Sequence, residues 1–241
     1  MKQQFQGAKS FGVMISLLRD KADATLRERS LFLEEIRQGA KLPSKIFSLL
    51  VCSSLFLAIY GGIMGIYHSW MQALSSAVKL PALYLITLLV CLPTLYFSNI
   101  IFGSKRTFAQ HFALVLTAVS VTSVLLFSFA PITLFFLIST THYQFLILLN
   151  VAIFTLTGWI GVSSLYQAAN CILEQDTEGS DTRRKILQAW LFLYAFVGCQ
   201  LGWTLRPFFG MPDSPFSLFR EREGNFYVSV FQSLGYLLGF R

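Results

Sequence analysis

The sequence predicts an all-α membrane protein, a polytopic bundle of about five transmembrane helices. No Asp, Glu, Lys or Arg occurs between Arg106 and Glu174, and Lys79 is the only charged residue in 46–104. Of all residues, 54% are hydrophobic and 13% are charged, whereas about 25% of an average soluble domain is charged. A soluble domain needs a charged, solvated surface, so uncharged stretches of this length indicate spans of a bilayer.

Residues 1–45 form a polar segment. Apolar residues recur at helical spacing within 9–38, and Gly39 is placed to end that helix. The segment is too long and too polar to be the start of a cleavable signal peptide. We expect it to lie on the cytoplasmic membrane surface or against a partner. The side chains expected to make this cytoplasmic contact are Leu33, Ile36, Arg37 and Lys41.

Residues 30–42, SLFLEEIRQGAKL, resemble the short actin-binding motif of the WASP-homology-two type. The matching positions are Leu33, Ile36, Arg37, Gly39 and Leu42. Pro43 interrupts the basic tail that the motif normally carries. The resemblance implies actin binding, but a juxtamembrane helix accounts for the same residues in a chain of prokaryotic character. We favour the juxtamembrane helix and do not expect actin as a partner.

Five apolar runs follow, each long enough to cross the hydrocarbon core of a bilayer. They cover residues 46–66, 80–102, 108–138, 143–172 and 186–205. Pro93 should kink the second run, and Pro131 should bend or end the third near its far end. Lys79 falls just before the second run, so we expect it in a connecting segment.

Small residues in the first and fourth runs predict close helix packing. Gly61 and Gly65 form a G-x-x-x-G pair, and Gly158 and Gly161 lie close together in the fourth run. Glycines let two helix backbones approach each other in lipid. Packing within the chain is favoured over a dedicated dimer interface.

The connecting segments predict the orientation. Fourteen Lys and Arg residues fall on the side that includes the N-terminus and five, Lys79 among them, on the other. Positive connectors face the cytoplasm, so we expect a cytoplasmic N-terminus and an external C-terminus. The net charge of +7 thus orients the chain and does not indicate nucleic-acid binding. The expected parts are 1–45 (cytoplasmic), 46–205 (transmembrane) and 206–241 (an external cap with an interfacial helix).

The chain that leaves the fifth run is rich in aromatic residues, prolines and arginines. Trp and Arg at a membrane exit commonly form an interfacial anchor. Proline-fixed turns could also pack the phenylalanines over the helix ends as an aromatic cap, where an arginine binds a headgroup or a partner carboxylate. The residues expected to contact a partner or lipid are Trp203, Arg206, Phe208, Phe209, Arg220 and Arg222.

The chain lacks the patterns of the common catalytic and metal sites. Its only histidines are His68, His111 and His142, and the expected topology places them on opposite faces of the membrane, which excludes a shared metal centre. The four cysteines lie in or beside apolar runs without a C-x-x-C pair, so neither a disulfide framework nor a zinc site is indicated. We expect no cofactor, no metal and no enzymatic activity.

Several segments are similar to an uncharacterised group of small bacterial polytopic membrane proteins. They include LPALYLITLLVCLPTLYFSNIIFGS, SFAPITLFF, LLNVAIF and GCQLGWTLRPFFGMPDSPFSLFREREGNFY. The resemblance implies membrane residence, in a bacterial inner or photosynthetic membrane, and implies no activity.

Two functions fit these observations. The first is a non-enzymatic accessory, assembly or scaffold subunit of a larger membrane complex, with lipids and other integral membrane subunits as partners. The second is a small transporter or channel for an uncharged or lipid-like solute. In that case Pro93, Pro131 and four amide side chains would mark the path: Asn99, Asn150, Gln167 and Asn170.

Overall fold

The computed structural model describes residues 31–39, 41–101, 106–140, 142–173 and 180–210, and also residues 218, 219, 228 and 235. The chain divides into two compact units, residues 1–41 and residues 42–241. Residues 9–30 of the predicted amphipathic helix lie outside the described residues, as do Arg220 and Arg222.

The second unit contains five long helices, each apolar enough to cross a membrane. They are α2 (Leu42–Ile66), α3 (Trp70–Ile101), α4 (Phe108–Ser139), α5 (Tyr143–Leu173) and α6 (Ser180–Thr204). All regular structure within the described residues is helical. The predicted all-α fold with five spans is therefore confirmed, and the chain is an integral membrane protein.

The helices differ in length. The longest, α3 and α4, have 32 residues each, which is about 48 Å at 1.5 Å per residue. The hydrocarbon core of a bilayer is about 30 Å thick, so these two helices tilt or extend beyond it. In α6 the apolar part is shorter, 21 residues from Arg184 to Thr204. Helix α6 is therefore too short to cover the full length of α3. The site described below lies along the part of α3 that α6 does not cover.

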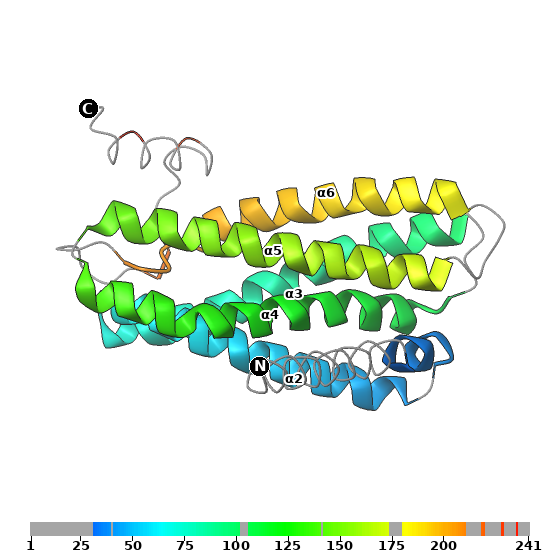
Figure 1. The fold of residues 1–241 in the computed structure, drawn as a ribbon, viewed down its shortest axis with the longest axis horizontal. Coiled ribbons are helices and arrows are strands. Elements are labelled where there is room, and N and C mark those ends of the chain that lie inside the picture. The colour runs from blue at the N-terminus through cyan, green and yellow to red at the C-terminus, as the bar shows by residue number, and fades with distance from the viewer. Residues whose placement is uncertain are drawn as a thin grey trace, which may run out of the picture. The chain divides into compact units, whose positions relative to one another are not determined.

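The helices pack in an order that differs from their order in the chain (Figure 1). Helix α2 packs on both α3 and α4, α5 packs on α4, and α6 packs on α3. Helices that follow one another in the chain run antiparallel, so the α2–α3 turn at 67–69, the α4–α5 connection and the end of α6 share one end of the bundle. We call this the turn end.

Glycines set the closest approaches between helices. A Cβ atom on Gly61 would lie 2.4 Å from the carbonyl oxygen of Ser76, and one on Gly65 would lie 2.5 Å from that of Gln72. In the same way, a Cβ on Gly161 would lie 2.1 Å from Thr122 Oγ1. The predicted packing role of these three glycines within the chain is confirmed. It is wrong for Gly158, because a Cβ there would meet no atom within 4 Å.

Helix α4 begins with a reciprocal cap. The Thr107 hydroxyl accepts a hydrogen bond from the backbone N–H of Gln110, and the Gln110 side chain accepts one from the backbone N–H of Thr107. This T-x-x-Q pattern satisfies donors that the first helical turn would otherwise leave unpaired. It fixes the start of α4 directly after Arg106.

One local prediction is wrong. Lys79 does not lie in a connecting segment, because α3 begins at Trp70 and includes it. Of the two outcomes predicted for Pro131, the end of the helix is not seen there, because α4 continues past it to Ser139. Moving Lys79 out of the connectors leaves four cations on its predicted side and does not change the direction of the charge bias.

In the first unit, residues 31–37 are helical. The helix ends at Gly39, whose φ of 74° is the left-handed conformation that glycine adopts at helix ends. Its backbone N–H donates to the carbonyl of Ile36 at 3.1 Å. Gly39 thus ends the helix as its sequence position predicts.

Candidate functional site

The end of α6 carries the arginine and tryptophan that the sequence singled out. The guanidinium carbon of Arg206 lies 3.5 Å from the centre of the Trp203 ring. This is a close cation–π stack, an interaction in which tryptophan is the best partner. The stack fixes the orientation of both side chains at the point where the chain leaves the helix.

Residues 205–210, which we call the exit segment, are bound to α3 through their backbone. Gln72 Nε2 donates to the carbonyl of Pro207 at 2.7 Å, and the Ser76 hydroxyl donates to the carbonyl of Phe208 at 2.6 Å. Gln72 and Ser76 are both buried. Because they are four residues apart on a helix, they lie on one face.

Lys79 continues this face of α3 and is also buried, with 6% of its surface exposed. Its ammonium donates to the carbonyls of Leu218 and Pro207. It also lies 5.0 Å from the centre of the Phe219 ring, within the range of a cation–π contact. The only charge of the first two spans is therefore bound to residues that follow the fifth.

The far end of the exit segment packs against the α2–α3 turn. Gly210 is buried with a φ of 71°, and a Cβ atom there would lie 2.6 Å from the Cβ of His68. Phe209 is buried as well, with 6% exposed, while Phe208 is half-buried. The segment thus runs along α3 from Lys79 towards His68.

The structure brings together four of the six residues predicted to contact a partner or lipid. Trp203 and Arg206 stack, and Phe208 and Phe209 follow in the segment bound to α3. The sequence reasoning missed Gln72, Ser76 and Lys79, because Lys79 was assigned to a connector. Their spacing of four and then three residues, one helical face, is the signal that could have found them.

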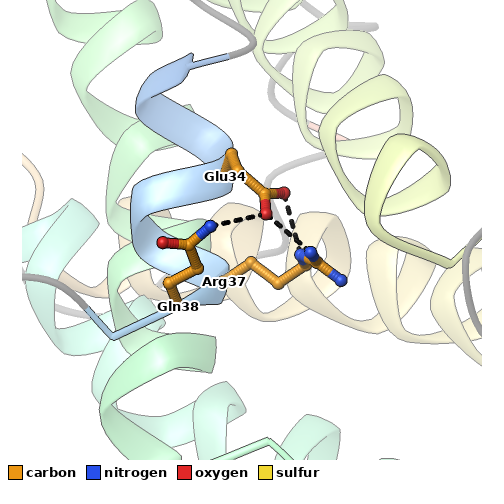
Figure 2. Close-up of polar contacts among 3 residues, drawn as sticks. All are labelled: Glu34, Arg37 and Gln38. Atoms are coloured by element: carbon orange, nitrogen blue, oxygen red, sulfur yellow. Dashed lines mark hydrogen bonds and ion pairs between the residues drawn. The ribbon is translucent and has the colours of Figure 1, made fainter.

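The residues of the predicted cytoplasmic contact belong to the first unit. Leu33 and Ile36 lie one turn apart on the helix at 31–37, and Lys41 follows with a φ of 51°. Arg37 donates two hydrogen bonds to the Glu34 carboxylate, at 2.6 and 2.8 Å, and Gln38 donates a third at 2.9 Å (Figure 2). The hydrogen bonds from Arg37, which have the larger effect, and from Gln38 lower the pKa of Glu34. The guanidinium of Arg37 is thus committed to a local ion pair.

A second polar cluster lies inside the bundle and joins three helices. The Tyr60 hydroxyl donates to Asn150 Oδ1 at 2.7 Å and lies 3.1 Å from the Thr133 hydroxyl. Tyr60 has one hydroxyl proton, so Thr133 is the donor to Tyr60. Asn150 Nδ2 donates in turn to the carbonyl of Leu146. All three clustered side chains are buried, and we call them the interior cluster.

The histidines lie at two ends of the bundle. His68 is in the α2–α3 turn and His142 is directly before α5, whereas His111 lies in the first turns of α4, against Tyr96. Within the described part of the chain, no three His, Cys, Asp or Glu side chains come together as metal ligands would.

Three comparisons with known proteins assign no family to the chain. No protein-family model, no curated protein and no solved structure matches the chain.

Proposed function

We propose that this protein is a non-enzymatic accessory, assembly or scaffold subunit of a larger membrane protein complex. The observation that carries the proposal is the Trp203–Arg206 stack at the end of α6. Tryptophan and arginine dominate the binding energy of protein interfaces. A guanidinium also carries a planar fork of donors that matches the geometry of a carboxylate or phosphate.

The setting of the stack supports this proposal. The exit segment is bound to α3 through hydrogen bonds to Pro207 and Phe208, so Arg206 projects from backbone that is already ordered. Pre-ordered contact residues lose less conformational entropy when a partner binds. A simple snorkelling anchor does not require such an arrangement.

Large aromatic side chains on α5 and α6 add further contact area. Trp159 is 73% exposed and Phe192 is 81% exposed. In a membrane such side chains face lipid or the helix of another subunit. We propose other integral membrane subunits and membrane lipids as partners, and neither nucleic acid nor actin.

The charge bias supports a cytoplasmic N-terminus, and we propose a bacterial inner or photosynthetic membrane as the location. A reporter cysteine at Ser214 should then react with an impermeant reagent supplied from outside. One at Ser180 should react only after the membrane is opened. The reverse pattern would overturn this orientation.

Purification from the native membrane in a mild detergent tests the function. We expect stoichiometric co-purifying subunits, which Arg206→Gln and Trp203→Ala should each reduce severalfold. Arg206→Lys should rescue poorly, because an ammonium lacks the planar fork. Arg184→Gln is the matched control, since Arg184 is exposed at the other end of α6. A chain that purifies alone, or unchanged subunit content in both variants, would contradict the proposal.

The interior cluster favours a second function, a small transporter or channel for an uncharged or lipid-like solute. Tyr60, Thr133 and Asn150 place hydroxyl and amide groups where three spans meet, and a solute with a hydroxyl group could exchange hydrogen bonds with them. Solute flux into proteoliposomes that falls severalfold in Tyr60→Phe, with Tyr96→Phe unchanged, would support this function. Flux equal to that of empty liposomes would exclude it for the solutes tried.

A further inference from the structure

The position of Lys79 along α3 places it away from the ends of the bundle. Lys79 is nine residues from Trp70, the first residue of α3, which is about 14 Å of helix. Trp70 is 80% exposed, and Tyr67 stacks on Tyr143 near it. Aromatic residues of this kind gather at membrane interfaces. Lys79 therefore lies well inside the level of the aromatic residues at the turn end.

Helix α6 ends before it reaches the level of Trp70, the first residue of α3. Its Gly202 lies against Leu83 of α3, with a Cβ position 3.9 Å from the Leu83 side chain, and the helix ends at Thr204. From Leu83 to Trp70, α3 continues for about 20 Å, whereas α6 continues for only two residues past Gly202. The exit segment lies along this part of α3, so the carbonyls of non-helical backbone lie against a helix long enough to cross a membrane.

Backbone carbonyls that are buried away from water need hydrogen-bond donors from the protein. Here the donors are Gln72, Ser76 and Lys79, and the acceptors are the carbonyls of Pro207, Phe208 and Leu218. A further oxygen, Gln72 Oε1, is buried and accepts no hydrogen bond in the described part of the chain. Within the described residues, the oxygens bonded at this junction and Gln72 Oε1 are all neutral.

The set of neutral oxygens resembles the chemistry of a cation site. Unwound backbone at the end of a membrane helix coordinates small cations through its carbonyls, and rings of carbonyls replace the water shell of a monovalent ion. Divalent cations, in contrast, usually take carboxylate ligands. Among the described residues no carboxylate contacts Lys79, whose ammonium meets two carbonyls and the face of the Phe219 ring.

We infer that the carbonyls of Pro207 and Leu218, with the Phe219 ring, form a monovalent-cation site in which the ammonium of Lys79 is a permanently attached cation. The positive charge is balanced by carbonyl dipoles and by the electron-rich ring face. Since the cation is attached to α3, the exit segment stays bound without any free ion. A variant that removes the ammonium and leaves its space should bind a small monovalent cation in its place.

The test uses the full-length protein in detergent and the variant Lys79→Ala, which leaves the space empty. Thermal unfolding and the rate of proteolysis within 206–219 are measured in chloride salts of potassium, sodium, ammonium and methylammonium. The reference is N-methylglucamine chloride at the same concentration of about 100 mM, which gives the same screening of charge. N-methylglucamine is too large for the space that the lysine side chain leaves.

In the reference salt, we expect proteolysis of Lys79→Ala to be at least about tenfold faster than that of the wild type, as loss of one buried charged hydrogen bond predicts. At least one small cation should restore most of the protection in a saturable way and leave the wild type unchanged. Equal recovery in every salt, or no recovery in any, would overturn the inference. Lys185→Ala, which removes an exposed lysine of α6, should behave as the wild type.

Lys79→Met keeps the inference testable if the alanine variant fails to fold. Methionine fills the space with an apolar chain that membrane helices accept, so it removes the charge and leaves no room for an ion. We expect faster proteolysis of 206–219 that no cation restores. Protection equal to that of the wild type would show that the charge is not needed and would overturn the inference.

Discussion

Helix α2 and the exit segment lie against the same stretch of α3, residues 72–79, yet different forces hold them. The contact with α2 has no room for side chains, because Gly61 and Gly65 bring its backbone against the carbonyls of Ser76 and Gln72. The contact with the exit segment is made by the side chains of these same two residues, and by Lys79, which donate to backbone carbonyls.

The comparison shows how one short stretch of helix can hold two neighbours without conflict. The backbone of α3 packs against α2, and the polar side chains of α3 donate hydrogen bonds to the exit segment. Lipid tails are as apolar as the side chains of a membrane helix, so the hydrophobic effect does not drive helices together. Close packing and interhelical hydrogen bonds do so instead. Residues 72–79 use both, so the two contacts can be broken separately.

The largest effect should come from filling the close contact with α2. Gly65→Ala places a Cβ about 2.5 Å from backbone atoms of Gln72 and Ala73, and backbone cannot move aside as a side chain can. We expect a loss of about 3 kcal/mol in the free energy of unfolding, measured by unfolding in detergent. Gly158→Ala is the matched control and should change stability little, since open space surrounds Gly158. Equal stability of the two variants would show that α2 and α3 are not in contact here.

A smaller effect is expected from removing one donor to the exit segment. Ser76→Ala removes the hydroxyl without adding volume and leaves the part-buried carbonyl of Phe208 without the Ser76 donor, which costs about 1–3 kcal/mol. The loss should appear as faster hydrogen exchange and proteolysis of 205–210, with the α2–α3 contact unchanged. Ser128→Ala is the control, because the exposed Ser128 donates to the carbonyl of Val124 in its own helix. An unchanged exit segment in Ser76→Ala would contradict docking through the backbone.

The smallest effect concerns the ion pair of the first unit, which has neither close packing nor burial. Arg37 and Gln38 lower the pKa of Glu34 from its ordinary value of 4.5. The pair therefore contributes fully above about pH 4.5 and is lost as the pH falls through the lower folded-state value. An NMR titration of the Glu34 carboxyl carbon should show the lowered pKa, and Arg37→Ala should raise it. An identical titration in the two proteins would show that the pair does not form in solution.

The spans could be predicted from the sequence because a bilayer imposes one strong rule, the exclusion of charge over about 20 residues. The same rule misplaced Lys79: a charge beside an apolar run was assigned to a connector. Its actual position depends on carbonyls of Pro207 and Leu218, more than 120 residues away in the chain. Sequence pattern alone does not reveal such a distant backbone contact.

Glycine spacing predicted close helix packing correctly for three glycines and wrongly for one. Gly61, Gly65 and Gly161 pack closely, whereas Gly158 does not, because only the tertiary arrangement decides which helix face meets a neighbour. At the membrane exit, residue type led us to expect that Trp203 and Arg206 contact a partner or lipid, but not that they stack on each other. It could not identify Gln72 and Ser76, because their role depends on contacts with Pro207 and Phe208, which are far away in the sequence.

Docking through main-chain carbonyls also bears on how this protein can evolve. Every residue has a backbone carbonyl, so at Pro207, Phe208 and Leu218 the bonds to α3 do not depend on which side chain is present. Substitutions there can alter specificity for a partner without undoing the attachment, whereas Gln72, Ser76 and Lys79 are constrained. Among homologues, we therefore expect variation at Pro207, Phe208 and Leu218, and the three donors on α3 to change rarely.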